Sequence, residues 1–236
     1  MPQVAEVILF SFASGVTVFI GGLLARSRIL DRFVSDNHLS HTMIAFGGGI
    51  LVAAVSFVLT PKAIELLSLP LLIVIFLAGV FGFLLLDEFI NRHGGRLAQL
   101  VAMSTDYIPE AIALGAVFSY DRNTGLLLAL FIGLQNLPES YNAYGDLVKS
   151  GFTPNKSLLI LLPFGFVGIA AALLGFSFLH GDDTLVNSLM LFAAGGIMYL
   201  VFRDIAPMIK YRRYWSPAVG ATLGFLLGMV GFKLLG

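Results

Sequence analysis

"STDYIPEAIALG" (residues 104–115) and "LQNLPESYNAYG" (residues 134–145) are two similar polar segments in a very apolar chain. Each carries a pair of acidic or amide residues four positions apart, with a proline between them. Residues at i and i+4 lie on the same face of a helix, so each segment predicts a helix with a polar stripe. The paired residues are Asp106, Glu110, Gln135 and Glu139. In the second helix, Asn142 and Asp146 continue the stripe.

The composition around these segments indicates an integral membrane protein. Of 236 residues, 58% are hydrophobic and 12% are charged, whereas about a quarter of a soluble domain is charged. The mean hydropathy is +0.92. We therefore expect lipid as a partner, in a plasma or inner membrane. The formal net charge of zero gives no argument for nucleic acid, and the absence of cysteine excludes disulfides and thiolate metal sites.

A membrane-spanning helix needs about 20 mostly apolar residues, and the chain offers eight such segments. The breaks between them are short, so we expect one all-α domain over residues 1–236. The start, "MPQVAEVILF", lacks a basic region and a cleavage site, and is expected to open the first helix. The eight predicted spans are residues 4–25, 42–60, 69–90, 97–119, 124–147, 157–179, 185–209 and 216–235.

Basic residues predict the orientation of these spans, because Lys and Arg concentrate in cytoplasmic loops. With the N-terminus outside the cytoplasm, the outer side carries only Arg122 and Lys233, while Lys62 and Arg203 lie near helix ends. Both termini are therefore expected outside the cytoplasm. The basic residues on the inner side are then Arg26, Arg28, Arg32, Arg92, Arg96, Lys149, Lys156, Lys210, Arg212 and Arg213.

Ionisable residues at bilayer depth cost a few kcal/mol each and usually mark function. Pro109 and Pro138 each remove a helix hydrogen bond and free a carbonyl one turn earlier. If the two helices face each other, three carboxylates, an amide oxygen and bare carbonyls meet at one point. Such an oxygen cluster suits a hard divalent cation. A buried network with Lys62 or Arg203, or a proton relay without metal, uses the same residues and remains open.

The two motifs also resemble those of the ZIP family of divalent-metal transporters, whose fourth and fifth helices carry "HNxPEG" and "HExPEG" types of motif. The corresponding stretches here are "DYIPEA" (106–111) and "QNLPES" (135–140). The similarity extends over the chain, through "SFASGVTVFIGGLLAR", "FGGGILVAAVSFVLTPKAIE", "LLPFGFVGIAAALLG" and "LFAAGGIMYLVFRDIAP". The resemblance implies eight helices with external termini and a metal centre between helices four and five.

Carried over by position, the resemblance implies a first metal site formed by Asp106, Glu110, Gln135 and Glu139, with Asp106 in place of the usual histidine. The family's second site is altered, because Tyr107, Asn136 and Leu162 stand where other members often have ligands. The positions expected beside the site or along the pathway are Tyr107, Asn136, Asn142, Asp146, Lys62, Arg203 and Asp204. Lys62 is either a helix-end lysine paired with Glu65 or, like Arg203, a replacement for the lost second charge.

These departures bear on selectivity. Without histidine in the predicted spans, the site favours manganese, iron(II) or magnesium over zinc. We expect a metal transporter driven by gradients, because no phosphate-binding loop is present. We do not expect an enzyme, because no histidine or cysteine lies beside the acids. It would be built from inverted halves, with the metal ion as substrate and no organic cofactor. A carrier of another solute such as an anion, a non-transporting metal sensor, and a homodimer remain open.

Overall fold

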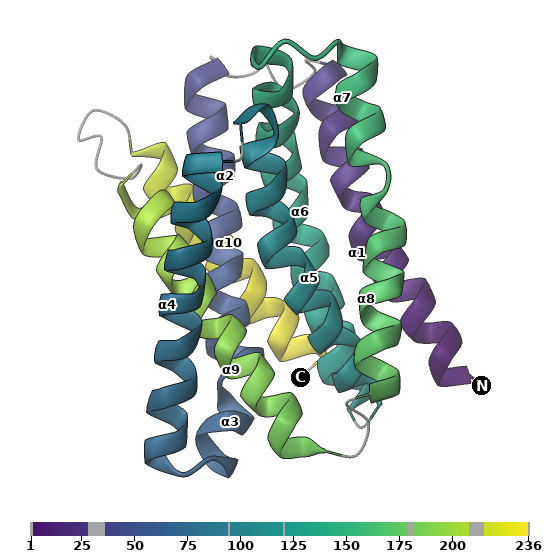
Figure 1. Cartoon of the computed structure of the whole chain (residues 1–236), viewed down its shortest axis with the longest axis vertical. Coiled ribbons are helices and arrows are strands. Elements are labelled where there is room, and N and C mark those ends of the chain that lie inside the picture. The colour runs from purple at the N-terminus through teal and green to yellow at the C-terminus, as the bar shows by residue number, and fades with distance from the viewer. Residues whose placement is uncertain are drawn as a thin grey trace.

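The computed structural model describes residues 2–27, 36–93, 95–119, 121–178, 182–207 and 215–235, and this part of the chain consists of helices joined by short turns (Figure 1). The side chains of a few helical residues within these ranges, Asp204 among them, fall outside the description. The α-helices are α1 (Pro2–Ser27), α2 (Asp36–Ala54), α3 (Pro61–Leu66), α4 (Leu69–His93), α5 (Ala98–Phe118), α6 (Arg122–Lys149), α7 (Pro154–Leu161), α8 (Phe164–Phe178), α9 (Asp183–Leu200) and α10 (Ser216–Leu235).

Three short elements interrupt or extend these helices. The π-helix η2 (Val55–Leu59) ends α2, the π-helix η4 (Val201–Ile205) ends α9, and the 3-10 turn η3 (Gly95–Leu97) precedes α5. A proline follows each π-helix closely, at Pro61 and at Pro207. Because proline cannot donate a backbone hydrogen bond, it limits how far the preceding helix can continue.

Each of the eight predicted spans is largely helical where the structure describes it, but three of them differ from the prediction in more than their end residues. The sixth span is divided at Pro163 into α7 and α8. The second and seventh spans end in π-helices, and the second is followed by the separate short helix α3. A π-turn widens the helix without changing its hydrophobicity, so the sequence pattern does not reveal it.

Six helical stretches in the described chain are long and apolar enough to cross a membrane. The helices α5 and α6 do not meet the same criterion, because the acids and amides of the two motifs interrupt their apolar runs. The expectation of spans without histidine needs a correction at two helix ends: one stretch begins at His41 and α4 finishes at His93. The six stretches are Gln3–Ser27, His41–Leu66, Leu69–His93, Pro154–Phe178, Asp183–Arg203 and Ser216–Leu235.

The helices pack in pairs that repeat between the two halves of the chain. Helix α1 packs on α6 as α8 packs on α5, and α2 packs on α10 as α9 packs on α4. The contact of α2 with α6 has its counterpart in the contact of α9 with α5. These pairings are the ones expected when α1, α2 and α4 correspond to α8, α9 and α10, and α5 corresponds to α6.

Glycines allow several of these pairs to approach backbone to backbone. A Cβ atom on Gly115 of α5 would overlap the carbonyl of Ala172 on α8, and one on Gly224 of α10 would overlap the carbonyl of Phe46 on α2. Small residues at such contacts allow the close packing on which helix association in membranes depends. The bundle core that results includes the fully buried Phe118 and Phe131.

Candidate metal centre

Glu110 and Gln135 join α5 to α6 near the middle of both helices. The amide Nε2 of Gln135 donates a hydrogen bond to Oε2 of Glu110 at 2.6 Å. Glu110 is 2% exposed and Gln135 is 3% exposed, so both polar side chains are almost completely withdrawn from bulk water. A buried polar group is costly unless it is hydrogen-bonded, and this contact therefore fixes the two motifs against each other.

A cavity of about 600 Å³ runs along this junction, between α2, α4, α5, α6 and η4. Its wall extends from the middle of α6 to Asn91 and Asp146, which lie near the C-terminal ends of α4 and α6. All four residues of the predicted α6 stripe line it. The polar residues on the wall are Asp87, Asn91, Thr105, Asp106, Gln135, Glu139, Asn142, Asp146 and Arg203.

The deep part of the cavity offers oxygen atoms to a cation. The Oε1 atom of Gln135 is buried and finds no hydrogen-bond partner among the residues that the structure describes. Asp106 and Glu139 contribute carboxylates to the same wall. Carboxylate and amide oxygens are the ligands that hard divalent cations prefer, so the donor types on this wall fit such an ion.

The four predicted ligands lie at the junction of α5 and α6 and on the cavity wall beside it. Within the described ranges, no group of three or more His, Asp or Glu side chains is close enough to hold a metal ion. Glu110 is buried against the amide of Gln135, whereas Asp106, Gln135 and Glu139 line the cavity. The expected ligand set is therefore distributed between the cavity wall and the helix junction behind it.

Tyr107 and Asn136, expected beside the ion, instead contact α8 and α1. The Tyr107 hydroxyl donates to the carbonyl of Phe164 at 3.2 Å, and a side chain at Gly168 would overlap that hydroxyl. Asn136 donates through Nδ2 to the carbonyl of Ser14 at 3.1 Å. Both side chains are almost completely buried. In this structure they connect helices.

The two outer residues of the α6 stripe make local contacts. Asn142 donates through Nδ2 to the Pro138 carbonyl at 2.8 Å, one turn earlier in the helix. Asp146 forms an exposed ion pair with Lys149, with 3.4 Å between Oδ1 and Nζ. Exposed ion pairs contribute little to stability, so the Asp146 carboxylate is only weakly held where α6 nears its end.

Arg203 of η4 lies on the cavity wall and forms an ion pair with Asp87 of α4. Tyr199 connects the two residues, since its hydroxyl donates to Oδ2 of Asp87 at 3.1 Å and accepts from Nη1 of Arg203 at 3.2 Å. The guanidinium also lies 5.9 Å from the centre of the Tyr199 ring. The side chain of Asp204, the neighbour that was expected to take part, lies outside the described side chains.

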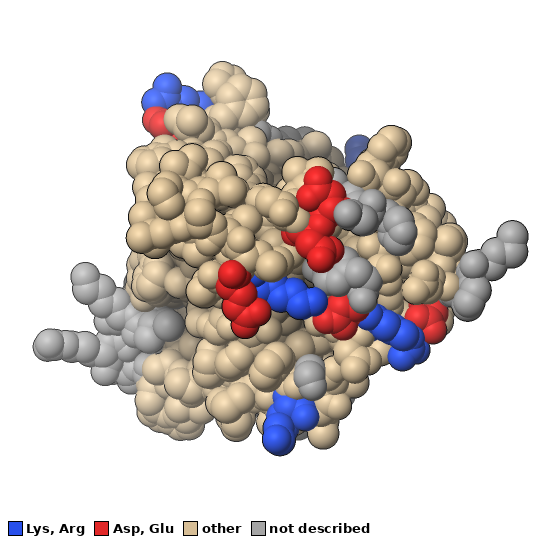
Figure 2. Space-filling model, turned by 90° about the horizontal axis from the view of Figure 1, so that it is seen from below, with Lys and Arg blue, Asp and Glu red and all other residues tan. Residues whose placement is uncertain are grey.

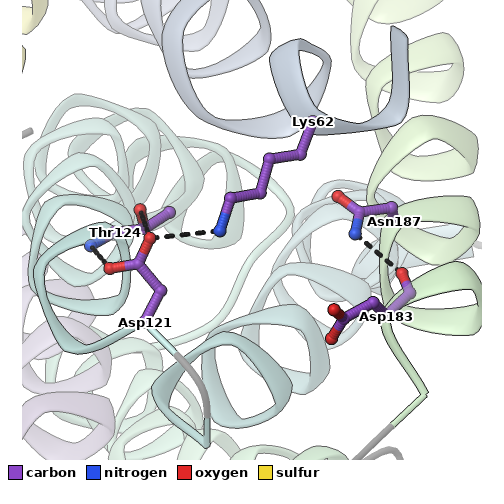
Figure 3. A network of polar contacts seen from close by, with 5 residues as sticks. All are labelled: Lys62, Asp121, Thr124, Asp183 and Asn187. Atoms are coloured by element: carbon purple, nitrogen blue, oxygen red, sulfur yellow. Dashed lines mark hydrogen bonds and ion pairs between the residues drawn. The ribbon is translucent and has the colours of Figure 1, made fainter. Parts of the chain in front are cut away.

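Lys62 is not among the residues that line this cavity and belongs to α3, which is labelled at the lower end of the bundle in Figure 1. Its Nζ is 3.3 Å from Oδ2 of Asp121, which also accepts from the Thr124 hydroxyl at 2.6 Å (Figure 3). Asp183 and Asn187 of α9 lie across from this pair in Figure 3. Seen from below, acidic and basic side chains gather near the middle of this end (Figure 2).

Sequence reasoning missed Asp87, Tyr199 and Asp121 as partners of the two basic residues. Asp87 had a signal that could have been used, because it is an acid within the apolar run of the third predicted span. Asp121 had the position of a helix N-cap, and it does accept a hydrogen bond from the Thr124 amide at 3.1 Å. No sequence pattern shows which distant base each acid meets.

The helix bundle, with six stretches able to cross a bilayer and acids enclosed among them, defines an integral membrane protein. Residues 96–236 match the family model described as ZIP zinc transporter, and the chain belongs to the ZIP family. It is similar to a protein named zinc transporter GufA from Myxococcus xanthus, at 30% identity over 145 residues. That match covers 58% of this chain and 57% of the relative, little more than half of each.

Proposed function

We infer that the chain carries divalent metal cations across a membrane, through a carboxylate and amide site between α5 and α6. The observation that carries this proposal is the cavity wall near the middle of α5 and α6, on which Asp106, Gln135 and Glu139 lie together. The two sequence motifs that supply these residues, at 106–111 and 135–140, lie in the part of the chain matched by the family model. The ion is the substrate, and the protein is a carrier, not an enzyme.

The cost of burying these groups supports the proposal. An acidic residue at the centre of a membrane helix costs about 2.5–3.5 kcal/mol on insertion scales. This cost arises three times in two adjacent helices, at Asp106 and Glu110 of α5 and at Glu139 of α6. A cation bound among them would offset it and would also give the buried Oε1 of Gln135 a partner. Glu110, whose carboxylate accepts a hydrogen bond from Gln135, would be a further ligand of the same ion.

The donor types bear on which metal is carried. The cavity wall presents carboxylate and amide oxygens, and the predicted first site has Asp106 where the family usually has histidine. Oxygen ligands suit manganese, iron(II) and magnesium, while imidazole suits zinc. We propose a shift in preference toward the harder ions, with zinc still accepted, since raw affinity for zinc exceeds that for manganese at most sites.

The cavity and the basic residues give the proposal a direction. The cavity leads toward the end where α4 and α6 finish, the end that carries Arg26, Arg92 and Lys149. By the distribution of basic residues, this end faces the cytoplasm and both termini lie outside. At the opposite end, Phe118 and Phe131 are fully buried and Lys62 pairs with Asp121. We propose that the protein in this arrangement opens inward, with these contacts closing the outer end.

The paired packing of the two halves supports alternating access. The contacts of α1, α2 and α4 have counterparts in the contacts of α8, α9 and α10. Such a correspondence is expected of an eight-span inverted repeat with a site at its centre. In such carriers, one packing arrangement can exchange for its symmetry-related counterpart, which opens the other side. Transport would follow the ion gradient, because the chain has no nucleotide-binding motif.

An anion carrier is less well supported than a cation carrier. The argument for an anion rested on Lys62 and Arg203, and each of them is paired with a carboxylate, Asp121 and Asp87. A metal sensor without transport would use the same cavity, and only flux separates it from a carrier.

Uptake of Mn²⁺ and Zn²⁺ into liposomes that contain the purified protein tests the proposal. Glu139→Gln should abolish uptake, because it removes a carboxylate from the cavity wall while keeping a side chain of the same size. Lys156→Gln, an exposed change on α7, is the matched control and should transport at the original rate. Metal binding without uptake by the unchanged protein would favour a sensor, and normal uptake by Glu139→Gln would move the site elsewhere.

A further inference from the structure

Arg203 and Asp87 form an ion pair on the wall of the cavity that Asp106 and Glu139 also line. Their side chains are 36% and 18% exposed, so both remain within reach of an ion in the cavity. The pair joins η4 to α4, two elements that are distant in the chain. A carboxylate on the path of a cation is therefore already occupied by a positive group of the protein.

Asp87 has three partners among the described side chains. Oδ1 accepts a hydrogen bond from Asn91 at 3.2 Å, while Oδ2 accepts from Tyr199 and pairs with Arg203. Without the guanidinium, the donors that remain beside this carboxylate among the described side chains are the neutral groups of Asn91 and Tyr199. A carboxylate in such a position attracts cations, and its field is screened less than it would be in open water.

We propose that Arg203 is a tethered cation that fills a cation-binding position at Asp87, so that a metal ion leaving the central site does not bind at Asp87 on its way out. This inference rests on the proposed transport function and assigns Arg203 the role of a positioning residue. Arginine suits the role because it stays protonated at all physiological pH values and holds a carboxylate with several donors.

The same end of α4 offers an internal comparison. Arg92 and Glu88 form an ion pair one turn apart, but both are exposed, at 69% and 53%, and neither lines the cavity. This pair has the same chemistry as Arg203 and Asp87 without access to the path of the ion. Its removal should therefore leave cation binding unchanged.

Calorimetric titration of Mn²⁺ into the purified full-length protein in detergent tests the proposal. Arg203→Gln should bind one more ion per chain than the unchanged protein, and Asp87→Asn in the same variant should remove that extra ion. Arg203→Lys keeps the charge and should bind no extra ion, and Arg92→Gln is the matched control. An unchanged ion count in Arg203→Gln, or an extra ion in Arg203→Lys, would overturn the proposal.

Two further measurements separate this inference from the proposed function and from a folding defect. In Glu139→Gln, the central ion should be lost, while the extra ion created by Arg203→Gln should remain. If Glu139→Gln alone loses no ion, the central site fails whatever Arg203 does. Asp87→Asn alone should keep the original ion count, because Arg203 already occupies that carboxylate. A lower count would show that Asp87 binds the ion itself and would refute the role of Arg203.

Discussion

Lys62, at the start of α3, forms an ion pair with Asp121, the residue that caps α6, with 3.3 Å between Nζ and Oδ2. The contact spans 59 positions of sequence. Asp121 thereby has two roles, since it also accepts hydrogen bonds from the amide and the hydroxyl of Thr124. The Asp121 side chain therefore caps the N-terminus of α6 and also ties this helix to α3, which follows the π-helix η2.

Two substitutions of Asp121 should separate these roles. Asp121→Asn keeps an N-cap side chain and loses the ion pair, whereas Asp121→Ala loses both. Loss of an N-cap costs about 0.5–2 kcal/mol, so Asp121→Ala should lower the thermal unfolding temperature in detergent more than Asp121→Asn does. Equal losses in the two variants would mean that Asp121 does not cap α6.

The ion pair should also keep the outer end closed. Because the chain has no cysteine, a single cysteine introduced at Ser119, near Asp121, can be labelled without background. Asp121→Asn should speed the reaction of that cysteine with a membrane-impermeant thiol reagent. As a control, Arg92→Gln should leave the rate unchanged. An unchanged rate in Asp121→Asn would mean that other contacts close this end.

The pH dependence of stability should show the same contact. Partial burial raises the pKa of the Asp121 carboxyl, but hydrogen bonds from Thr124 and Lys62 outweigh it, so the pKa lies below its ordinary value. A depressed pKa stabilises the folded state above the unfolded pKa of about 3.9. The stabilisation is lost as the pH falls through the folded value. The difference in unfolding temperature between the unchanged protein and Asp121→Asn should therefore be constant near neutral pH and shrink below pH 4. A difference that grows in acid would contradict this sign.

Close packing at the glycines gives a prediction with an internal control. A Cβ atom on Gly115 would overlap the backbone carbonyl of Ala172, whereas one on Gly145 would meet nothing within 4 Å. Gly115→Ala should therefore separate α5 from α8 and reduce both stability and transport. Gly145→Ala should be neutral or slightly stabilising, because alanine is favoured over glycine by about 1 kcal/mol in a helix. Similar unfolding temperatures for the two variants would contradict the packing of α5 on α8.

Much of the fold could be predicted because apolar runs mark membrane helices. The eight expected segments are largely helical in the described chain, and the i,i+4 spacing identified the residues of α6 that share the cavity. The family interpretation, made from the motifs at residues 106–111 and 135–140, is confirmed. These features depend on local sequence, where helical periodicity determines which side chains share a face.

The rest depends on contacts between distant segments. Lys62 meets Asp121 and Arg203 meets Asp87 because of how α3, α4 and η4 pack, and no local spacing encodes those pairs. Likewise, the sequence alone could not show that Tyr107 turns toward Phe164 instead of the expected metal. Its hydroxyl fits there because Gly168 of α8 leaves space for it.

The number of central ions should be one. Tyr107 and Asn136, at positions where the family often has ligands of a second ion, are engaged with the carbonyls of Phe164 and Ser14. Elemental analysis of the purified protein after removal of loosely bound metal should find one ion per chain. Two tightly held ions, both lost in Glu139→Gln, would show that the second site persists despite these substitutions.

Selectivity should depend on Asp106, which lies on the cavity wall where the family usually has histidine. A carboxylate is a hard ligand that suits manganese or iron(II), whereas imidazole favours zinc. Asp106→His should therefore raise the ratio of zinc to manganese uptake in liposomes without abolishing either. The new imidazole must lose its proton to bind metal, and its ordinary pKa is about 6.5. Binding by this variant should thus weaken as the pH falls through 6, more steeply than binding by the unchanged protein. Asp106→Asn is the matched control, because it keeps an oxygen ligand and adds no group that titrates in this range. If Asp106→His leaves both the metal ratio and the pH profile unchanged, residue 106 does not contact the ion, and the metal is held by α6 and Glu110 alone.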